Sequence, residues 1–180
     1  MNDRVYNNGV DRLRSSERIQ RLEVDRVVDL CTGNTQINSV LDVGTGSGLF
    51  AEAFAKRSIK IAGVDLNPDM IDAAKKHLPD AEFKLSAAEI LPFDDNSFDL
   101  VFMGVLLHEV DDYTKALEEA KRVSAKQVSV LEWKYAVEDF GPPIEHRLKE
   151  EFLKQLSDKI GFSKMEVVPL KNLVLYHFFK

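Results

Sequence analysis

The segment VLDVGTGSGLF, residues 40–50, decides how the rest of this chain folds. A short apolar run, which predicts a buried strand, leads directly into three glycines at alternate positions between residues 44 and 48. Apolar residues from Leu49 onward then recur at helical spacing. A strand, a glycine loop and a helix in this order are typical of α/β proteins that bind a ligand at the carboxyl ends of their strands.

Strand and helix patterns alternate along the remainder of the chain. The predicted strands cover residues 39–44, 60–65, 81–87, 98–104, 127–133, 164–170 and 173–180, and the predicted helices cover residues 17–31, 68–77, 113–124 and 148–160, together with the helix that follows the glycines. This alternation predicts a doubly wound, mainly parallel α/β sheet with helices on both faces. The last two strands would supply an antiparallel edge. We expect residues 1–180 to form a single domain, in which residues 1–16 are a polar arm.

Composition and charge argue against several classes of function. The net charge is −6 and the basic residues are spread along the chain, which disfavours binding to nucleic acid. The single cysteine, Cys31, cannot form an internal disulfide, and the four histidines show no metal-ligand spacing, so no metal is predicted. The sequence contains no apolar run of membrane-spanning length and does not begin with a signal segment, so we expect a cytoplasmic protein.

Three classes of ligand compete for the glycine loop. A Walker phosphate loop would end in Gly-Lys-Ser/Thr, whereas Leu49 follows the last glycine here. A dinucleotide fingerprint would need glycine or alanine at that same position. Asp42, just before the loop, would repel a pyrophosphate but attract a cationic ligand such as S-adenosylmethionine. Asp65 ends the next strand and could accept hydrogen bonds from ribose hydroxyls, although dehydrogenases place an acid similarly.

Three segments carry the family resemblance: VLDVGTGSG (40–48), VDLNPDMIDAAK (64–75) and AAEILPFDDNSFDLVFMGVLLHEVDD (87–112). They resemble successive motifs of the class I S-adenosylmethionine-dependent methyltransferases, and most closely the small type 11 branch with its ubiquinone/menaquinone-biosynthesis-like enzymes. The resemblance implies a seven-stranded sheet of order 3-2-1-4-5-7-6, with strand 7 antiparallel. It also implies methyl transfer from S-adenosylmethionine, and the charge of the chain favours a small-molecule acceptor.

The resemblance implies a role for each residue that matches a motif. Asp42 would hold the ammonium group of the cofactor, and Asp65 would hold its ribose hydroxyls. The other expected cofactor contacts are Gly44, Thr45, Gly46, Gly48, Leu66, Met70, Ala88, Glu89, Met103, Gly104 and His108. The family often has an acid at the position of Ala87, where it accepts a hydrogen bond from the adenine amino group, and alanine cannot do so.

The chemistry beyond the cofactor is less well marked in the sequence. The candidates are His108, Glu109 and His146 for a catalytic base, and Tyr6, Trp133 and Arg147 for contacts with the substrate. A cover over the acceptor would come from the arm, from residues 133–148, or from a partner subunit in a homodimer. Two alternatives stay open: a methyltransferase-fold module that binds the cofactor without catalysis, and a nucleotide-dependent oxidoreductase.

Overall fold

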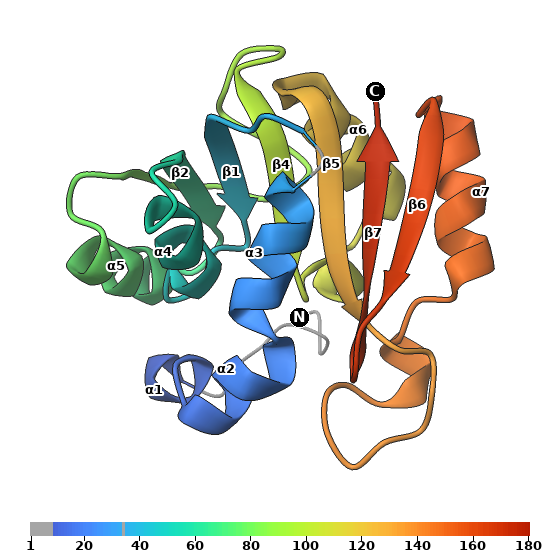
Figure 1. Ribbon diagram of the computed structural model, residues 1–180, viewed down its shortest axis with the longest axis horizontal. Coiled ribbons are helices and arrows are strands. Elements are labelled where there is room, and N and C mark those ends of the chain that lie inside the picture. Colours follow the sequence, from blue (N-terminus) through green and yellow to red (C-terminus); the bar gives the residue numbers. More distant parts are fainter. Residues whose placement is uncertain (1–8, 34) are drawn as a thin grey trace.

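The computed structural model describes residues 9–33 and 35–180, which include a seven-stranded sheet (Figure 1). The strands are β1 (Ser39–Val43), β2 (Lys60–Asp65), β3 (Glu82–Leu85), β4 (Phe98–Gly104), β5 (Ser124–Trp133), β6 (Lys164–Pro169) and β7 (Leu173–Phe179). Their order is β3-β2-β1-β4-β5-β7-β6. β7 runs antiparallel to both β5 and β6, while the pairs from β3 to β5 are parallel. The predicted strand order and the antiparallel strand are therefore confirmed.

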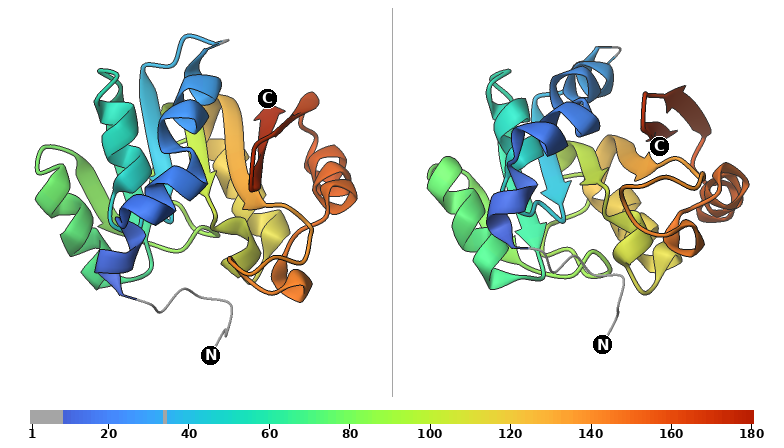
Figure 2. Two further views of the ribbon diagram at one scale, coloured as in Figure 1. Left: turned by 60° about the horizontal axis from the view of Figure 1, so that its bottom comes forward. Right: turned by 90° about the horizontal axis from the view of Figure 1, so that it is seen from below.

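Helices cover both faces of this sheet (Figures 1 and 2). They are α1 (Val10–Leu13), α2 (Ser16–Leu22), α3 (Val24–Thr32), α4 (Leu49–Ala55), α5 (Pro68–His77), α6 (Tyr113–Val123) and α7 (Glu150–Ile160), with short 3-10 helices η1 (Leu107–Glu109) and η2 (Ile144–His146). The apolar faces of α3, α4 and α5 form one core with one face of the sheet, and those of α6 and α7 form a second core with the other. This is the Rossmann-like architecture that the alternating pattern predicts.

The N-terminal helical region differs from the prediction. The single helix expected over residues 17–31 is wrong, because Glu23 adopts a left-handed conformation with φ of 49° and separates α2 from α3. The Glu23 carboxylate accepts a hydrogen bond from the backbone N–H of Lys171 at 2.7 Å, which ties the break to the turn between β6 and β7. The spacing of apolar residues along a helix gives no sign of a hydrogen bond to such a distant residue. As a result, α1 and α2 lie beside the carboxyl ends of the parallel strands (Figure 2).

Local sequence signals account for several other element ends. Asn67 caps α5 by accepting a hydrogen bond from the N–H of Asp69, and proline occupies the first helical position. Gly161 ends α7 in the left-handed conformation, with φ of 80°. β5 begins at Ser124, earlier than predicted, because α6 passes into it without a loop. The cap at Asn67 also fixes the turn between the end of β2, which carries Asp65, and the start of α5.

Candidate functional site

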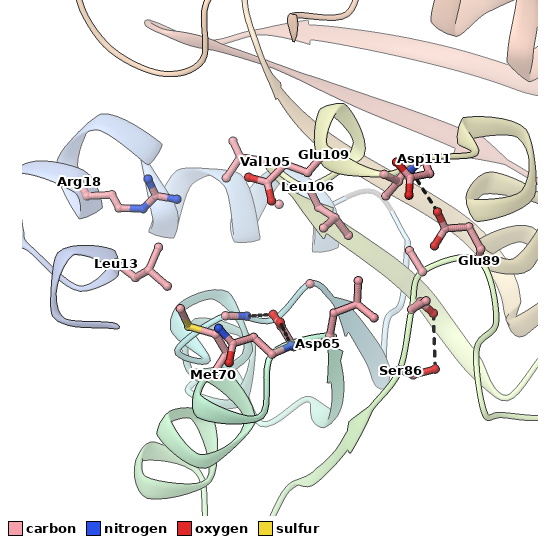
Figure 3. A pocket seen from close by; sticks show the side chains of 18 residues that line it. Leu13, Arg18, Asp65, Met70, Ser86, Glu89, Val105, Leu106, Glu109 and Asp111 are labelled. Atoms are coloured by element: carbon pink, nitrogen blue, oxygen red, sulfur yellow. Dashed lines mark hydrogen bonds between the residues drawn. The ribbon is translucent and has the colours of Figure 1, made fainter. Parts of the chain in front are cut away.

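A cavity of about 540 Å³ opens at the carboxyl ends of the central strands. Its walls come from the glycine loop after β1, the end of β2, residues 86–89 after β3, residues 104–111 after β4, and the N-terminal helices. Figure 3 shows Leu106 and Glu109 on one side of the cavity, facing Asp65 and Met70 on the other. This is the edge at which open α/β sheets bind their ligands.

Two of the three glycines shape the cavity wall. Gly44 and Gly46 line it and have positive φ values of 69° and 53°. A Cβ atom at Gly44 would lie 2.6 Å from the Leu106 side chain, so a larger residue would displace the opposite wall. Gly48, expected at the cofactor, does not line the cavity. It precedes α4, and a Cβ there would lie 3.2 Å from the backbone of Ala74, so this glycine allows α4 to approach α5.

Asp65 is held firmly at the end of β2 and lines the cavity. Its Oδ2 atom accepts a hydrogen bond from the backbone N–H of Gly46 at 2.8 Å, and its Oδ1 atom accepts one from Asn67 at 2.9 Å. Burial raises the pKa of this carboxyl above its usual range, against the opposing effect of the backbone donors. Each carboxylate oxygen has a second lone pair and can accept a further hydrogen bond from a ligand.

Asp42 lies deeper, at 2% exposure, beside a small recess next to the main cavity. Its Oδ2 atom accepts a hydrogen bond from the Thr45 hydroxyl at 2.8 Å. Burial raises the pKa of Asp42 to about 7. Ser47 also lines the recess, and its buried hydroxyl has no hydrogen-bond partner within the part of the chain that the structure describes. Such an unpaired polar atom is uncommon in a folded protein and would gain from a ligand.

Most of the other expected cofactor contacts lie together at the cavity. Those that line it are Leu66, Met70, Ala88, Glu89 and Gly104, and Ala87 also contributes to the wall. Thr45 lines the adjoining recess. Met103 does not line the cavity, because its side chain is completely buried in the core shared with α6 and α7. His108 is also absent from the wall, since its ring faces the interior of the protein.

The segment that follows β4 has two features that the sequence did not indicate. Val105 lines the cavity with a φ of 51°, which is a strained conformation for a β-branched residue. Its N–H donates to the carbonyl of Leu131 at 2.7 Å, and this contact with β5 holds the segment in place. The second feature is that His108 Nδ1 lies 2.8 Å from a carboxylate oxygen of Glu132, a buried residue of β5.

The remaining candidates lie away from the cavity, except Glu109, which lines it. Trp133 is buried against Phe140, and His146 belongs to η2. Arg147 is 4% exposed, and its guanidinium donates to the carbonyls of Lys134, Phe140 and Pro142. It therefore shapes the loop after β5 and does not present its charge to the cavity. Tyr6 lies outside the described residues.

The cavity also has walls that sequence reasoning missed. Leu13 from α1 and Arg18 from α2 both line it, and so do Val105 and Leu106 after β4. The sequence offers the arm of residues 1–16 as one of three possible covers, but its polar composition does not single out Leu13 as the residue over the glycine loop. The break at Glu23 separates α2 from α3, and α1 and α2 then bring Leu13 and Arg18 to the cavity.

No helix in residues 9–33 or 35–180 has the length and apolar character needed to cross a membrane. In the same part of the chain, no group of three or more histidine, cysteine or carboxylate side chains could hold a metal ion.

Comparison with known proteins gives consistent matches. The family profile described as "Methyltransferase domain" matches residues 41–131. A demethylmenaquinone methyltransferase from Renibacterium salmoninarum is 33% identical over 135 residues, which cover 75% of this chain and 55% of that protein. The matches cover 35–55% of the length of the curated demethylmenaquinone methyltransferases from Chlorobaculum tepidum and Renibacterium salmoninarum.

Solved structures match over nearly the whole chain. A SAM-dependent methyltransferase from Aquifex aeolicus is 25% identical with a TM-score of 0.82, covering 94% of this chain and 96% of that one. The magnesium protoporphyrin IX methyltransferase of Synechocystis, solved with bound SAM, has a TM-score of 0.69 and 16% identity and covers 98% of this chain and 86% of its own. At 16% identity, the similarity to the Synechocystis enzyme shows a shared fold and nothing more.

Proposed function

The chain belongs to the methyltransferase domain family, in the class I type 11 branch, and we propose that it transfers a methyl group from S-adenosylmethionine to a small-molecule acceptor. The observation that carries the proposal is the pair of strand-end acids, Asp42 and Asp65, around a glycine loop that lacks the residues of a phosphate site. A net charge of −6 supports a small molecule over a nucleic acid as acceptor.

The residues present fit this cofactor. A cavity of about 540 Å³ is within the range of small-molecule sites, and its carboxylates suit a ligand with two cationic groups. Asp65 would accept hydrogen bonds from the ribose hydroxyls. Asp42 and the unpaired Ser47 hydroxyl would serve the amino-acid end of the cofactor from the recess. The apolar wall of Leu66, Met70 and Ala88 would lie against the adenine.

The protein's contribution to the reaction would be positioning. The sulfonium group of the bound cofactor supplies a methyl carbon that is already electrophilic. The chain has to hold a nucleophile in line with that carbon and exclude water, and orientation of this kind can be worth about 7–11 kcal/mol. Residues 1–16 would act as the cover, because Leu13 in α1 already lies over the glycine loop.

Calorimetry tests the cofactor assignment. The protein should bind S-adenosylmethionine and S-adenosylhomocysteine and should not bind NAD or ATP at similar concentrations. Preferred binding of NAD would favour the oxidoreductase alternative. Binding of S-adenosylmethionine without transfer to any acceptor in a broad panel would favour the inactive module instead.

A further inference from the structure

His108 and Glu132 form a buried pair between η1 and β5. The His108 Nδ1 atom lies 2.8 Å from Glu132 Oε2 and 3.1 Å from Oε1, and the backbone N–H of His108 donates to Oε1 at 3.0 Å. Both residues are at most 4% exposed. A carboxylate in this position favours the tautomer that carries its proton on Nδ1, which leaves Nε2 as the basic nitrogen.

The other ring nitrogen of His108 faces a carboxylate at the cavity. Nε2 lies 3.7 Å from Oε1 of Glu109, and the Glu109 side chain is 17% exposed and lines the cavity. In Figure 3, Glu109 lies beside Val105 and Leu106, opposite Asp65. The distance is longer than a hydrogen bond, but catalytic contacts are often loose before substrate binds. Glu132, His108 and Glu109 thus form a row of a carboxylate, an imidazole and a second carboxylate that runs from the core to the cavity.

The charge of the cavity indicates the kind of molecule that would approach this row. Asp65 and Glu89 are assigned to the cofactor, so the charged side chains that remain for the acceptor among the described lining residues are the acids Glu109 and Asp111 and the base Arg18. Val105, Leu106 and Val110 provide aliphatic surface next to Glu109. An apolar molecule with a cationic group matches this lining better than a carboxylate or a phosphate does, because like charges repel.

We propose that Glu109 is the catalytic base for an amine acceptor, and that His108 and Glu132 are positioning residues for it. The proposal rests on the methyl transfer proposed above. The acceptor arrives as an ammonium ion and gives one N–H proton to the Glu109 carboxylate. Its freed lone pair then forms the N–C bond with the methyl group as the S–C bond breaks, and that electron pair returns to sulfur. The proton can pass from Glu109 to Nε2 of His108.

Other titratable groups near this row come from neighbouring elements. Glu132 extends from β5, Glu109 belongs to η1, and Tyr176 lies on β7. Burial raises the pKa of Tyr176 well above its usual range, and the negative charges of Glu150, Glu132 and Glu151 raise it further. Tyr176 therefore keeps its proton and cannot serve as a base.

The acceptor class is tested with three probes of similar shape: 2-phenylethylamine, 4-ethylphenol and 3-phenylpropanoate, each with methyl-labelled S-adenosylmethionine. We expect kcat/KM for the amine to exceed those of the other two at least about tenfold, the scale of a single favourable charge contact. Equal or better transfer to the phenol or the carboxylate overturns the proposal, as does no transfer to the amine. Because S-adenosylhomocysteine binding is measured separately, a failure to bind it would instead overturn the proposed function.

Variants test the roles within the row. Glu109→Gln should lower kcat for the amine about 100-fold, a typical contribution of a general base. Glu132→Gln should lower kcat for the amine and leave its KM nearly unchanged, because His108 then loses the carboxylate that fixes its tautomer and orientation. Glu132→Asp should restore part of kcat. The matched control, Glu118→Gln on the exposed face of α6, should change neither quantity.

Two outcomes contradict these roles. An unchanged kcat in Glu109→Gln would remove Glu109 as the base. A loss of activity in Glu132→Gln that Glu132→Asp does not partly restore would reduce the buried pair to a structural contact. If Glu132→Gln does not fold, the partly exposed Glu109→Gln still decides the proposal.

Discussion

The Asp65 Oδ2 atom accepts a 2.8 Å hydrogen bond from the backbone N–H of Gly46, and this contact joins the end of β2 to the glycine loop after β1. The second carboxylate oxygen is held by the N–H of Asn67. The carboxylate is therefore oriented before any ligand binds, and a ligand does not have to pay the entropy of fixing it. This geometry makes Asp65 the most direct test of the cofactor site.

Asp65→Ala should weaken S-adenosylhomocysteine binding by about 1.5–3 kcal/mol, the scale of hydrogen bonds to a charged group. Calorimetry on the folded variant measures this difference. Asp69→Ala is the matched control, since Asp69 is exposed on α5 and does not line the cavity. Equal affinities for wild type and Asp65→Ala would remove Asp65 from the ribose.

Asp42 should make stability depend on pH. Its pKa is raised from 3.8 to about 7 by burial, so the folded state binds the proton more tightly than the unfolded state does. The stability that this group contributes is complete below the unfolded pKa and is lost as pH rises through about 7. The loss is about 1.4 kcal/mol for each unit by which the two pKa values differ.

Urea unfolding at about pH 5 and about pH 8 measures this effect. The wild-type free energy of unfolding should fall between the two conditions by more than that of Asp42→Asn, whose amide does not titrate. The exposed Asp69→Asn variant should follow the wild type. Parallel behaviour of wild type and Asp42→Asn would show that Asp42 is ionised throughout this range.

Ala87 offers a gain-of-affinity experiment. It lines the cavity at the position where the family resemblance implies an acid that accepts from the adenine amino group. Ala87→Asp should tighten S-adenosylhomocysteine binding by about 1 kcal/mol, typical of one added hydrogen bond. Ala136→Asp, at an exposed position in the loop after β5, controls for the added charge. If both variants bind like the wild type, a backbone carbonyl already satisfies the amino group.

The sequence predicts the sheet and about half of the residues that line the cavity because the signals for them are local. The apolar run before Gly44 and the alternation of elements fix which strands are parallel and where their carboxyl ends meet. Asp65 and Met70 follow directly, since they stand at or just after a strand end. The same reasoning finds the Asn67 cap and the Gly161 helix end, which depend on one or two residues.

The residues that were expected at the cavity but do not line it owe their positions to contacts that the sequence pattern does not show. His108 faces Glu132 from another strand, and Arg147 binds carbonyls of its own loop, so neither side chain points where its position in the chain suggested. Gly48 serves the packing of α4 on Ala74, although it looks identical to its neighbours in the motif. The left-handed Glu23, held by the N–H of Lys171, leaves no mark in a helical pattern.

The last prediction concerns the N-terminal arm. Leu13 lies 3.2 Å from where a Cβ of Gly46 would be, and the Arg14 guanidinium donates to the Ser47 carbonyl at 2.9 Å and pairs with Glu52 of α4. These contacts fasten α1 over the glycine loop. If the arm covers the bound cofactor, ligand binding and closure of α1 stabilise each other.

Hydrogen exchange in residues 10–22 should therefore slow when S-adenosylhomocysteine is added. Arg14→Ala should weaken its binding by about 1 kcal/mol through loss of the fastening contacts, and deletion of residues 1–14 should weaken it further while the fold persists. Arg12→Ala, at an exposed position in α1 two residues before Arg14, is the matched control and should bind like the wild type. Unchanged exchange at saturating ligand, together with full affinity in Arg14→Ala, would show that α1 is no lid. The candidates for the cover would then be a partner subunit or residues 133–148, whose shape Arg147 maintains.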